Sequence, residues 1–100
     1  MTKKIAFIIN PISGTMKKED LPDMIRKGLD KRLFTPEIVF TEYREHGTEL
    51  ATSFVKRNFE IVVAVGGDGT VNEVAKALVH TNCSLGIIPI GSGNGLARHL

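Results

Sequence analysis

Hydrophobic residues occur along this chain in two kinds of run. Short apolar runs, rich in β-branched residues, cover residues 4–10, 37–41, 61–65 and 85–88. Runs of this kind are typical of strands that are buried on both faces, as in parallel sheets. Between and after them, apolar residues recur at three- and four-residue spacing, which indicates helices with one buried face. The pattern therefore predicts four strands that alternate with helices.

The predicted helices have recognisable ends and buried faces. Asp20 is a candidate cap for the first helix and Thr48 for the second, Asn58 is expected to end the second, and a fourth helix begins within residues 96–100. The residues expected to face the sheet are Leu21, Met24, Ile25, Leu29 and Leu33 in the first helix, Leu50, Ala51, Phe54 and Val55 in the second, and Val71, Val74, Ala75 and Leu78 in the third.

This order of elements predicts an α/β fold, a three-layer Rossmann-like parallel sheet of about four strands with flanking helices. Right-handed crossovers bring the carboxyl ends of all strands to one edge of such a sheet. Residues 10–14, Thr41, residues 66–70 and residues 91–95 each follow a predicted strand. We therefore expect them to meet at that edge, where open α/β folds bind ligands.

Composition excludes several classes of function. A formal net charge of +2 over 100 residues is too small to imply nucleic acid or an anionic membrane as a partner. The first apolar run is too short for a signal-peptide core or a transmembrane segment. The single cysteine, Cys83, cannot form an internal disulfide, and no Cys/His cluster suggests zinc. A reduced, cytoplasmic setting fits best.

The chemistry centres on the sequence Gly-Gly-Asp-Gly-Thr at residues 66–70, between a strand and a helix. Closely spaced glycines let the backbone approach a ligand, and the first N–H groups of the following helix can bind phosphate. Asp68 would repel phosphate unless it holds Mg²⁺, orients a water molecule or accepts a proton. The alternative is an ordinary tight turn with a solvated Asp68.

Two common nucleotide-binding motifs do not match. No glycine is followed by lysine, which excludes a Walker-type phosphate loop, and the glycines at residues 91–95 lack the third glycine of the dinucleotide fingerprint. A Rossmann enzyme of hydride transfer is therefore disfavoured.

Three segments together, residues 10–14, 66–73 and 89–98, resemble the catalytic domain of the diacylglycerol kinase and sphingosine kinase family of lipid kinases, and the resemblance covers essentially the whole chain. It implies a nucleotide-binding domain like that of phosphofructokinase and NAD kinase. It also implies ATP as the bound nucleotide, contacted by Asn10, Pro11, Ile12, Ser13, Gly14, Thr41, Gly66, Gly67, Asp68, Gly69, Thr70, Val71, Asn72, Glu73 and Ser92.

The same resemblance implies roles for the two acidic residues. Asp68 would be catalytic by holding Mg²⁺ through water, and Glu73 would act through the same ion or its waters. For Glu73 the alternative is a first-turn carboxylate that interacts favourably with the helix N-terminus. Arg98 and His99 would lie near the lipid acceptor or the phosphates, or else would be solvated side chains.

Members of this family carry a second, β-rich domain that binds the lipid and supplies the catalytic base. Residues 1–100 would then be the N-terminal ATP-binding part, inactive alone, from a protein that associates peripherally with a membrane. A diacylglycerol- or sphingoid-type lipid is the expected acceptor, and Gly95-Leu96 departs from the Asp-Phe of many bacterial members. An unpaired sheet edge also predicts self-association into a homo-oligomer. The alternatives are an NAD kinase-like enzyme and a non-catalytic nucleotide-binding module.

Overall fold

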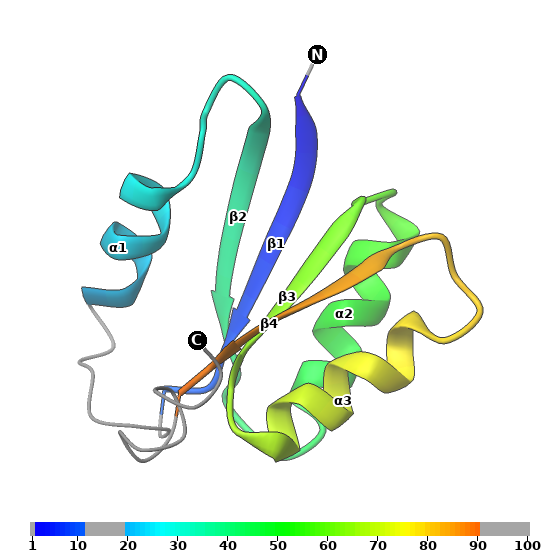
Figure 1. The fold of residues 1–100 in the computed structure, drawn as a ribbon. Helices are drawn as coiled ribbons and strands as arrows, with labels where there is room; N and C mark the ends of the chain where they lie inside the picture. The colour runs from blue at the N-terminus through cyan, green and yellow to red at the C-terminus, as the bar shows by residue number, and fades with distance from the viewer. Residues whose placement is uncertain (1, 12–19, 91–100) are drawn as a thin grey trace.

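The chain folds into a four-stranded parallel sheet in the order β2-β1-β3-β4 (Figure 1). This computed structural model describes residues 2–11 and 20–90. The elements are β1 (Lys3–Ile9), α1 (Asp20–Gly28), β2 (Phe34–Phe40), α2 (His46–Lys56), β3 (Ile61–Gly66), α3 (Asp68–Leu78) and β4 (Ser84–Pro89). The predicted α/β architecture and the order of its elements are confirmed within this part of the chain.

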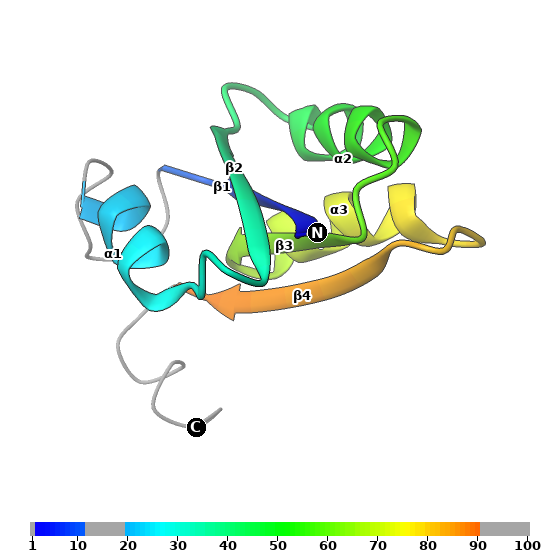
Figure 2. The same cartoon turned by 90° about the horizontal axis from the view of Figure 1, so that it is seen from above.

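The central strands β1 and β3 explain why apolar runs form this sheet. Successive side chains of a strand point to opposite faces, so a strand that is covered on both sides must be apolar throughout. On β1, Ala6 and Ile8 join a core with α2 and α3, while Ile5, Phe7 and Ile9 join a core with α1. Figure 2 shows α2 and α3 together on one side of the sheet.

The face beneath α2 and α3 holds the more completely buried core. Phe54 of α2 and Val74 of α3 are almost fully buried there, and the ring of Phe54 packs against that of Phe59 at a centroid distance of 4.7 Å. As predicted, α2 ends near Asn58, which adopts a left-handed conformation with φ of 64°.

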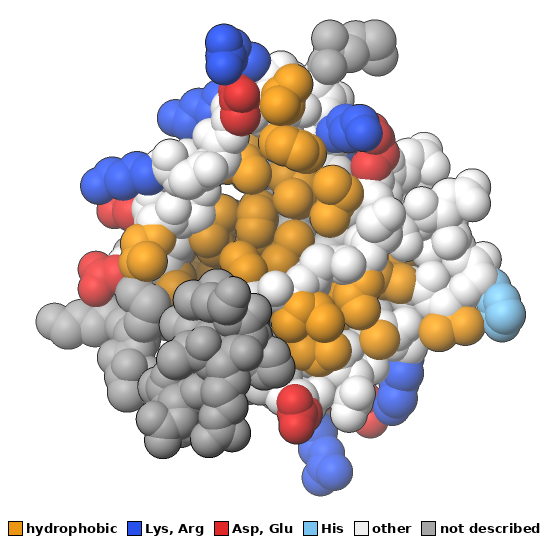
Figure 3. Space-filling model, in the orientation of Figure 1, with side chains coloured by type: hydrophobic (Ala, Val, Ile, Leu, Met, Phe, Trp, Pro, Cys, Tyr) orange, Lys and Arg blue, Asp and Glu red, His pale blue; other side chains and the backbone are white. Residues whose placement is uncertain are grey.

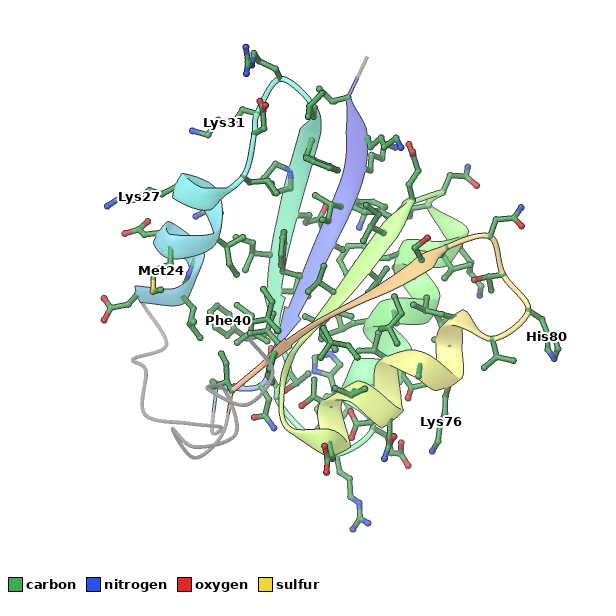
Figure 4. The ribbon with its side chains drawn as sticks, viewed as in Figure 1. Met24, Lys27, Lys31, Phe40, Lys76 and His80 are labelled. Carbon is green, nitrogen blue, oxygen red and sulfur yellow. The ribbon has the colours of Figure 1, made fainter. Side chains whose placement is uncertain are left out.

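The residues that the structure describes cover the opposite face only in part, because α1 has nine residues. Leu21 is buried and Ile25 and Leu29 pack against the core, as predicted. The prediction was wrong for Met24 and Leu33, which are more than half exposed. Leu33 lies beyond the end of α1, so helical spacing no longer applies to it. Met24 lies on α1 (Figure 4) and is half exposed, although it lines the groove between α1 and the sheet.

An apolar groove of about 370 Å³ lies between α1 and the strands β1, β3 and β4. Its walls include Phe7, Leu21, Met24 and Ile88. Figure 3 shows hydrophobic side chains gathered on this face of the molecule, between α1 and β4. Ile87 of β4 is also half exposed.

The strand bounds differ from the predicted ones by one residue at several ends, and the starts of α2 and β2 differ by two or three residues. The helix α2 begins at His46, before Thr48, and its N-cap is Glu45 with φ of 70° and no capping bond from its own side chain. Strand β2 begins at Phe34 and so includes Pro36. A proline is tolerated there because β2 is an edge strand of the described sheet.

No helix within residues 2–11 and 20–90 combines the length and the apolar character needed to cross a bilayer.

Candidate functional site

The strand register brings three of the predicted site residues side by side. Ile9 at the end of β1 is aligned with Phe40 of β2 on one side and with Val65 of β3 on the other. The Thr41 backbone N–H donates to the Ile9 carbonyl at 2.8 Å, and the Asn10 N–H donates to the Val65 carbonyl at 3.0 Å. Thr41, Asn10 and Gly66 therefore leave the sheet together at its carboxyl edge.

The strand order places a topological switch at this position. From β1 the chain runs to β2 on one side of it, and then crosses to β3 on the other side. Open α/β sheets bind ligands at the crevice where the order reverses, outside the carboxyl ends of the strands. Asn10 and Gly66 flank that point, which is the expected location of a ligand site.

Gly66 is required by close packing at the end of β3. A Cβ atom on it would lie 2.7 Å from Thr70 Oγ1 and 3.3 Å from Asn10 Cβ. Thr70 is itself 5% exposed, although it is polar. The glycine thus lets the first turn of α3 fold back against the strand end.

The start of α3 presents backbone donors to the same edge. Gly67 is the N-cap in an extended conformation, and Asp68 is the first helical residue; as a glycine, Gly67 has no side chain that could cap this end. The first N–H groups of a helix have no partner within the helix, and the helix dipole makes them attractive to anions. A Cβ on Gly69 would meet no atom within 4 Å, so this turn has open space in front of it.

The carboxylate of Glu73 bonds across to the start of α2. Its Oε2 accepts from the Glu45 N–H at 3.1 Å, and its Oε1 accepts from the Gly47 N–H at 3.0 Å. The Thr48 hydroxyl donates to the Glu73 carbonyl at 2.7 Å. We call these three bonds the Glu73 clamp. The clamp explains why α2 begins before Thr48, because the helix N-terminus is capped by a side chain from α3.

The clamp also fits tightly around Gly47. A Cβ there would come within 2.7 Å of Glu73 Oε1. A weaker contact joins the same elements at the surface, where Lys76 Nζ lies 3.7 Å from Glu45 Oε1 and Lys76 projects from α3 (Figure 4).

A cavity of about 530 Å³ opens at this edge of the sheet. Six predicted site residues line it, namely Asn10, Pro11, Thr41, Gly69, Thr70 and Glu73. Gly66, Gly67, Asp68, Val71 and Asn72 lie next to it at the end of β3 and the start of α3 without lining it. The Val71 side chain packs against the core, and its backbone N–H donates to the Gly67 carbonyl at 3.1 Å.

Glu42, Tyr43 and Arg44 also line the cavity, and sequence reasoning missed them. Their position in the sequence could have identified them, since they directly follow Thr41 in the loop after β2. The Tyr43 ring stacks on the His46 ring, with 4.2 Å between centroids and 14° between planes. Its hydroxyl donates to Glu49 Oε1 at 2.7 Å, and this bond to a carboxylate raises the pKa of Tyr43.

Several predicted residues lie outside the described part of the chain. These are Ile12, Ser13, Gly14, Ser92, Arg98 and His99, together with the predicted helix at residues 96–100.

A magnesium site built entirely from protein ligands is absent from the described ranges, where no group of three or more His, Cys, Asp or Glu residues could hold a metal ion. Asp68 stands at the start of α3 with its side chain exposed. Mg²⁺ keeps several waters and commonly takes one or two carboxylates plus substrate phosphates. The lone Asp68 carboxylate therefore fits an ion whose other ligands are water and phosphate.

Comparison with known proteins places the chain in a family. Residues 4–100 match the model of the diacylglycerol kinase catalytic domain. All of the chain aligns with diacylglycerol kinases of Staphylococcus saprophyticus, at 38% identity, and Staphylococcus haemolyticus, at 37%, and covers 33% and 31% of their lengths. The chain thus spans about a third of these curated relatives.

A solved structure supports the fold. A diacylglycerol kinase structure from Bacillus anthracis superposes with a TM-score of 0.74 at 24% identity, covering 98% of this chain and 36% of the other. The parallel sheet and the glycine turn before α3 are consistent with the family match over residues 4–100. The chain belongs to the diacylglycerol kinase catalytic domain family.

Proposed function

We propose that residues 1–100 are the ATP-binding part of a lipid kinase, which transfers the γ-phosphate of ATP to the hydroxyl of a diacylglycerol- or sphingoid-type lipid. The observation that carries the proposal is the cavity at the switch point between β1 and β3, bounded by the glycine turn at the start of α3. Its volume lies in the range of small-molecule sites. Family membership supports phosphoryl transfer as the chemistry.

In this proposal the phosphates of ATP bind at the start of α3. Gly67 and Gly69 leave the backbone open to close approach, and the N–H groups of the first turn supply donors. Asn10 and Thr41 bond ribose or phosphate oxygens from the neighbouring strand ends, where both line the cavity. The remaining ATP contacts inferred from the family resemblance complete this half of the site.

Asp68 is the residue that would hold Mg²⁺, through a water molecule. When bound, the ion would neutralise charge on the phosphates during transfer. Glu73 contributes differently, because both of its carboxylate oxygens already accept backbone hydrogen bonds from the start of α2. We assign it to holding the cavity wall in place.

The lipid and the catalytic base are assigned to residues of a longer protein. The chain covers about a third of its curated relatives, and the apolar groove between α1 and β4 offers surface for further packing. The isolated chain is therefore expected to bind ATP without phosphorylating lipid. Its apolar β4 edge, with Ile87 exposed, is expected to promote self-association.

Equilibrium binding tests the proposal. Calorimetric titration of the purified 100-residue chain with Mg-ATP should give saturable binding, and titration with NAD should give weaker binding or none. A preference for NAD would favour an NAD kinase-like enzyme. Lipid phosphorylation by the chain alone would contradict the assignment of the base to other residues, whereas a chain that binds no nucleotide would contradict the proposal itself.

A further inference from the structure

Tyr43 is an aromatic residue that folding does not explain. It belongs to neither hydrophobic core, and it is 55% exposed. Its ring nevertheless has defined neighbours, because one face stacks on His46 and the hydroxyl is bonded to Glu49. The stacked face and the hydroxyl thus hold this exposed ring in place, although the ring packs against neither core.

The surroundings of Tyr43 add to this rigidity. His46 Nδ1 accepts a hydrogen bond from the Glu42 N–H at 2.9 Å, which fixes the imidazole on which the tyrosine stacks. The Glu73 clamp holds Glu45 and Gly47 in the same turn. The loop from Glu42 to Gly47 is thus tied at several points, and Tyr43 is presented from it to the cavity wall.

The other residues of the cavity suggest what the ring contacts. Asn10, Gly69 and Thr70 line the same cavity with polar and backbone groups, which suit phosphates and ribose. A nucleotide also needs a flat apolar surface for its base, and aromatic side chains provide one by stacking. Among the described residues that line this cavity, Tyr43 is the only aromatic one.

We propose that Tyr43 is the stacking platform for the nucleobase of the bound nucleotide. This inference rests on the proposed function, since it requires a nucleotide in the cavity, and it adds the residue that recognises the base. Stacking is tolerant of base identity, because every base has a π-face. Tyr43 therefore contributes affinity for a nucleotide over a bare polyphosphate.

The sequence offers a direct probe of this contact. The chain has one tyrosine and no tryptophan, so its intrinsic emission comes from Tyr43. Titration with Mg-ATP should quench this emission in a saturable way, whereas Mg-tripolyphosphate should bind without quenching it. A parallel titration of N-acetyltyrosinamide corrects for absorption by the nucleotide.

Variants separate the base contact from the phosphate contact. Tyr43→Leu should weaken Mg-ATP binding by about 5- to 150-fold, the range typical of one stacked base, and should change tripolyphosphate binding less than about twofold. Tyr43→Phe keeps the ring and should stay within about threefold of the wild type for ATP. The control Leu33→Ala removes an exposed side chain outside the cavity and should leave ATP binding unchanged.

The outcomes distinguish a failure of the Tyr43 platform from a failure of the proposed ATP site. Unchanged ATP affinity in Tyr43→Leu, or unquenched emission in a wild-type chain that binds ATP, would overturn the platform and leave the ATP site intact. An equal loss of ATP and tripolyphosphate affinity would also overturn it, because the ring would then act through the loop and not on the base. A wild-type chain that binds neither ligand would overturn the proposed function, and the platform with it.

Discussion

Replacement of Glu73 by alanine should loosen the contact between α2 and α3. The change removes the carboxylate that accepts the Glu45 N–H at 3.1 Å and the Gly47 N–H at 3.0 Å, and it leaves two donors at the start of α2 without that partner. Hydrogen bonds to charged groups contribute about 1.5–3 kcal/mol each, but the Glu45 N–H is exposed and can bond water instead. The expected loss of unfolding free energy is therefore about 2 kcal/mol.

For a domain of this size, such a loss lowers the midpoint of thermal unfolding by roughly 8–16 °C. Thermal denaturation followed by circular dichroism measures it. Glu60→Ala is a matched control, because Glu60 is exposed and its side chain bonds to no other residue that the structure describes. The unfolding midpoint of this variant should stay close to that of the wild type. Glu73→Gln should fall between the two, since one amide oxygen remains as an acceptor.

The same variants separate the two roles considered for Glu73. A clamp predicts a lower unfolding midpoint in the absence of nucleotide, and weaker ATP binding because the loop from Glu42 to Gly47 is released. A direct magnesium role predicts an unchanged midpoint and a loss of Mg²⁺ dependence. A loss of 1 kcal/mol lowers the unfolding midpoint of such a domain by about 4–8 °C. A midpoint for Glu73→Ala within about 2 °C of the wild type would therefore refute the clamp.

Three further predictions follow from the packing and charges around the site. Gly66→Ala should lower the free energy of unfolding, measured by urea denaturation, by about 1–3 kcal/mol, because its methyl group would lie 2.7 Å from Thr70 Oγ1. An unchanged urea midpoint would contradict this packing. In Gly69→Ala the added methyl group would contact no atom within 4 Å, so the change should stabilise the chain by about 0.5 kcal/mol. It should also weaken ATP binding, because the methyl group would occupy the space in front of the turn. ATP binding equal to wild type would favour an ordinary turn over a phosphate site. The hydrogen bond from Arg57 lowers the pKa of Glu37 from its ordinary value of 4.5. The ion pair therefore stabilises the folded chain fully above pH 4.5, and this stabilisation is lost as the pH falls through the lowered pKa of Glu37. Both side chains are more than a third exposed, so Arg57→Ala should reduce the acid-induced loss of unfolding free energy, measured by urea denaturation, by less than about 1 kcal/mol. A larger effect would show that the pair is better shielded than its exposure indicates.

The fold was predictable because its two central strands, β1 and β3, are buried on both faces along most of their length. Residues 5–9 of β1 and residues 61–65 of β3 are apolar without interruption, and such a run is enough to identify a buried strand. Periodicity could not show where α1 ends, however, so Leu33 was assigned to a helix that stops at Gly28. The start of β2 was missed because Pro36 reads as a turn residue until the strand is known to lie at a sheet edge.

The candidate site was predictable in outline for a similar reason. Asn10, Thr41 and Gly66 are brought together by parallel register alone, which follows from the order of elements. The contact between Glu73 and Gly47 spans 26 residues and depends on how α2 and α3 pack, which no local pattern encodes. The position of Tyr43 against His46 likewise depends on the turn that this contact holds.

Whether ATP binds at the carboxyl edge of the sheet can be measured residue by residue. Backbone amide spectra of the ¹⁵N-labelled chain should be recorded during titration with Mg-ATP, and again with the Asp68→Ala variant. We predict shifts concentrated at Asn10, Thr41 and residues 66–72, and a loss of Mg²⁺ dependence in the variant. Saturating nucleotide that leaves these amides unmoved, or that shifts only residues of the groove between α1 and β4, would contradict an ATP site at the switch point.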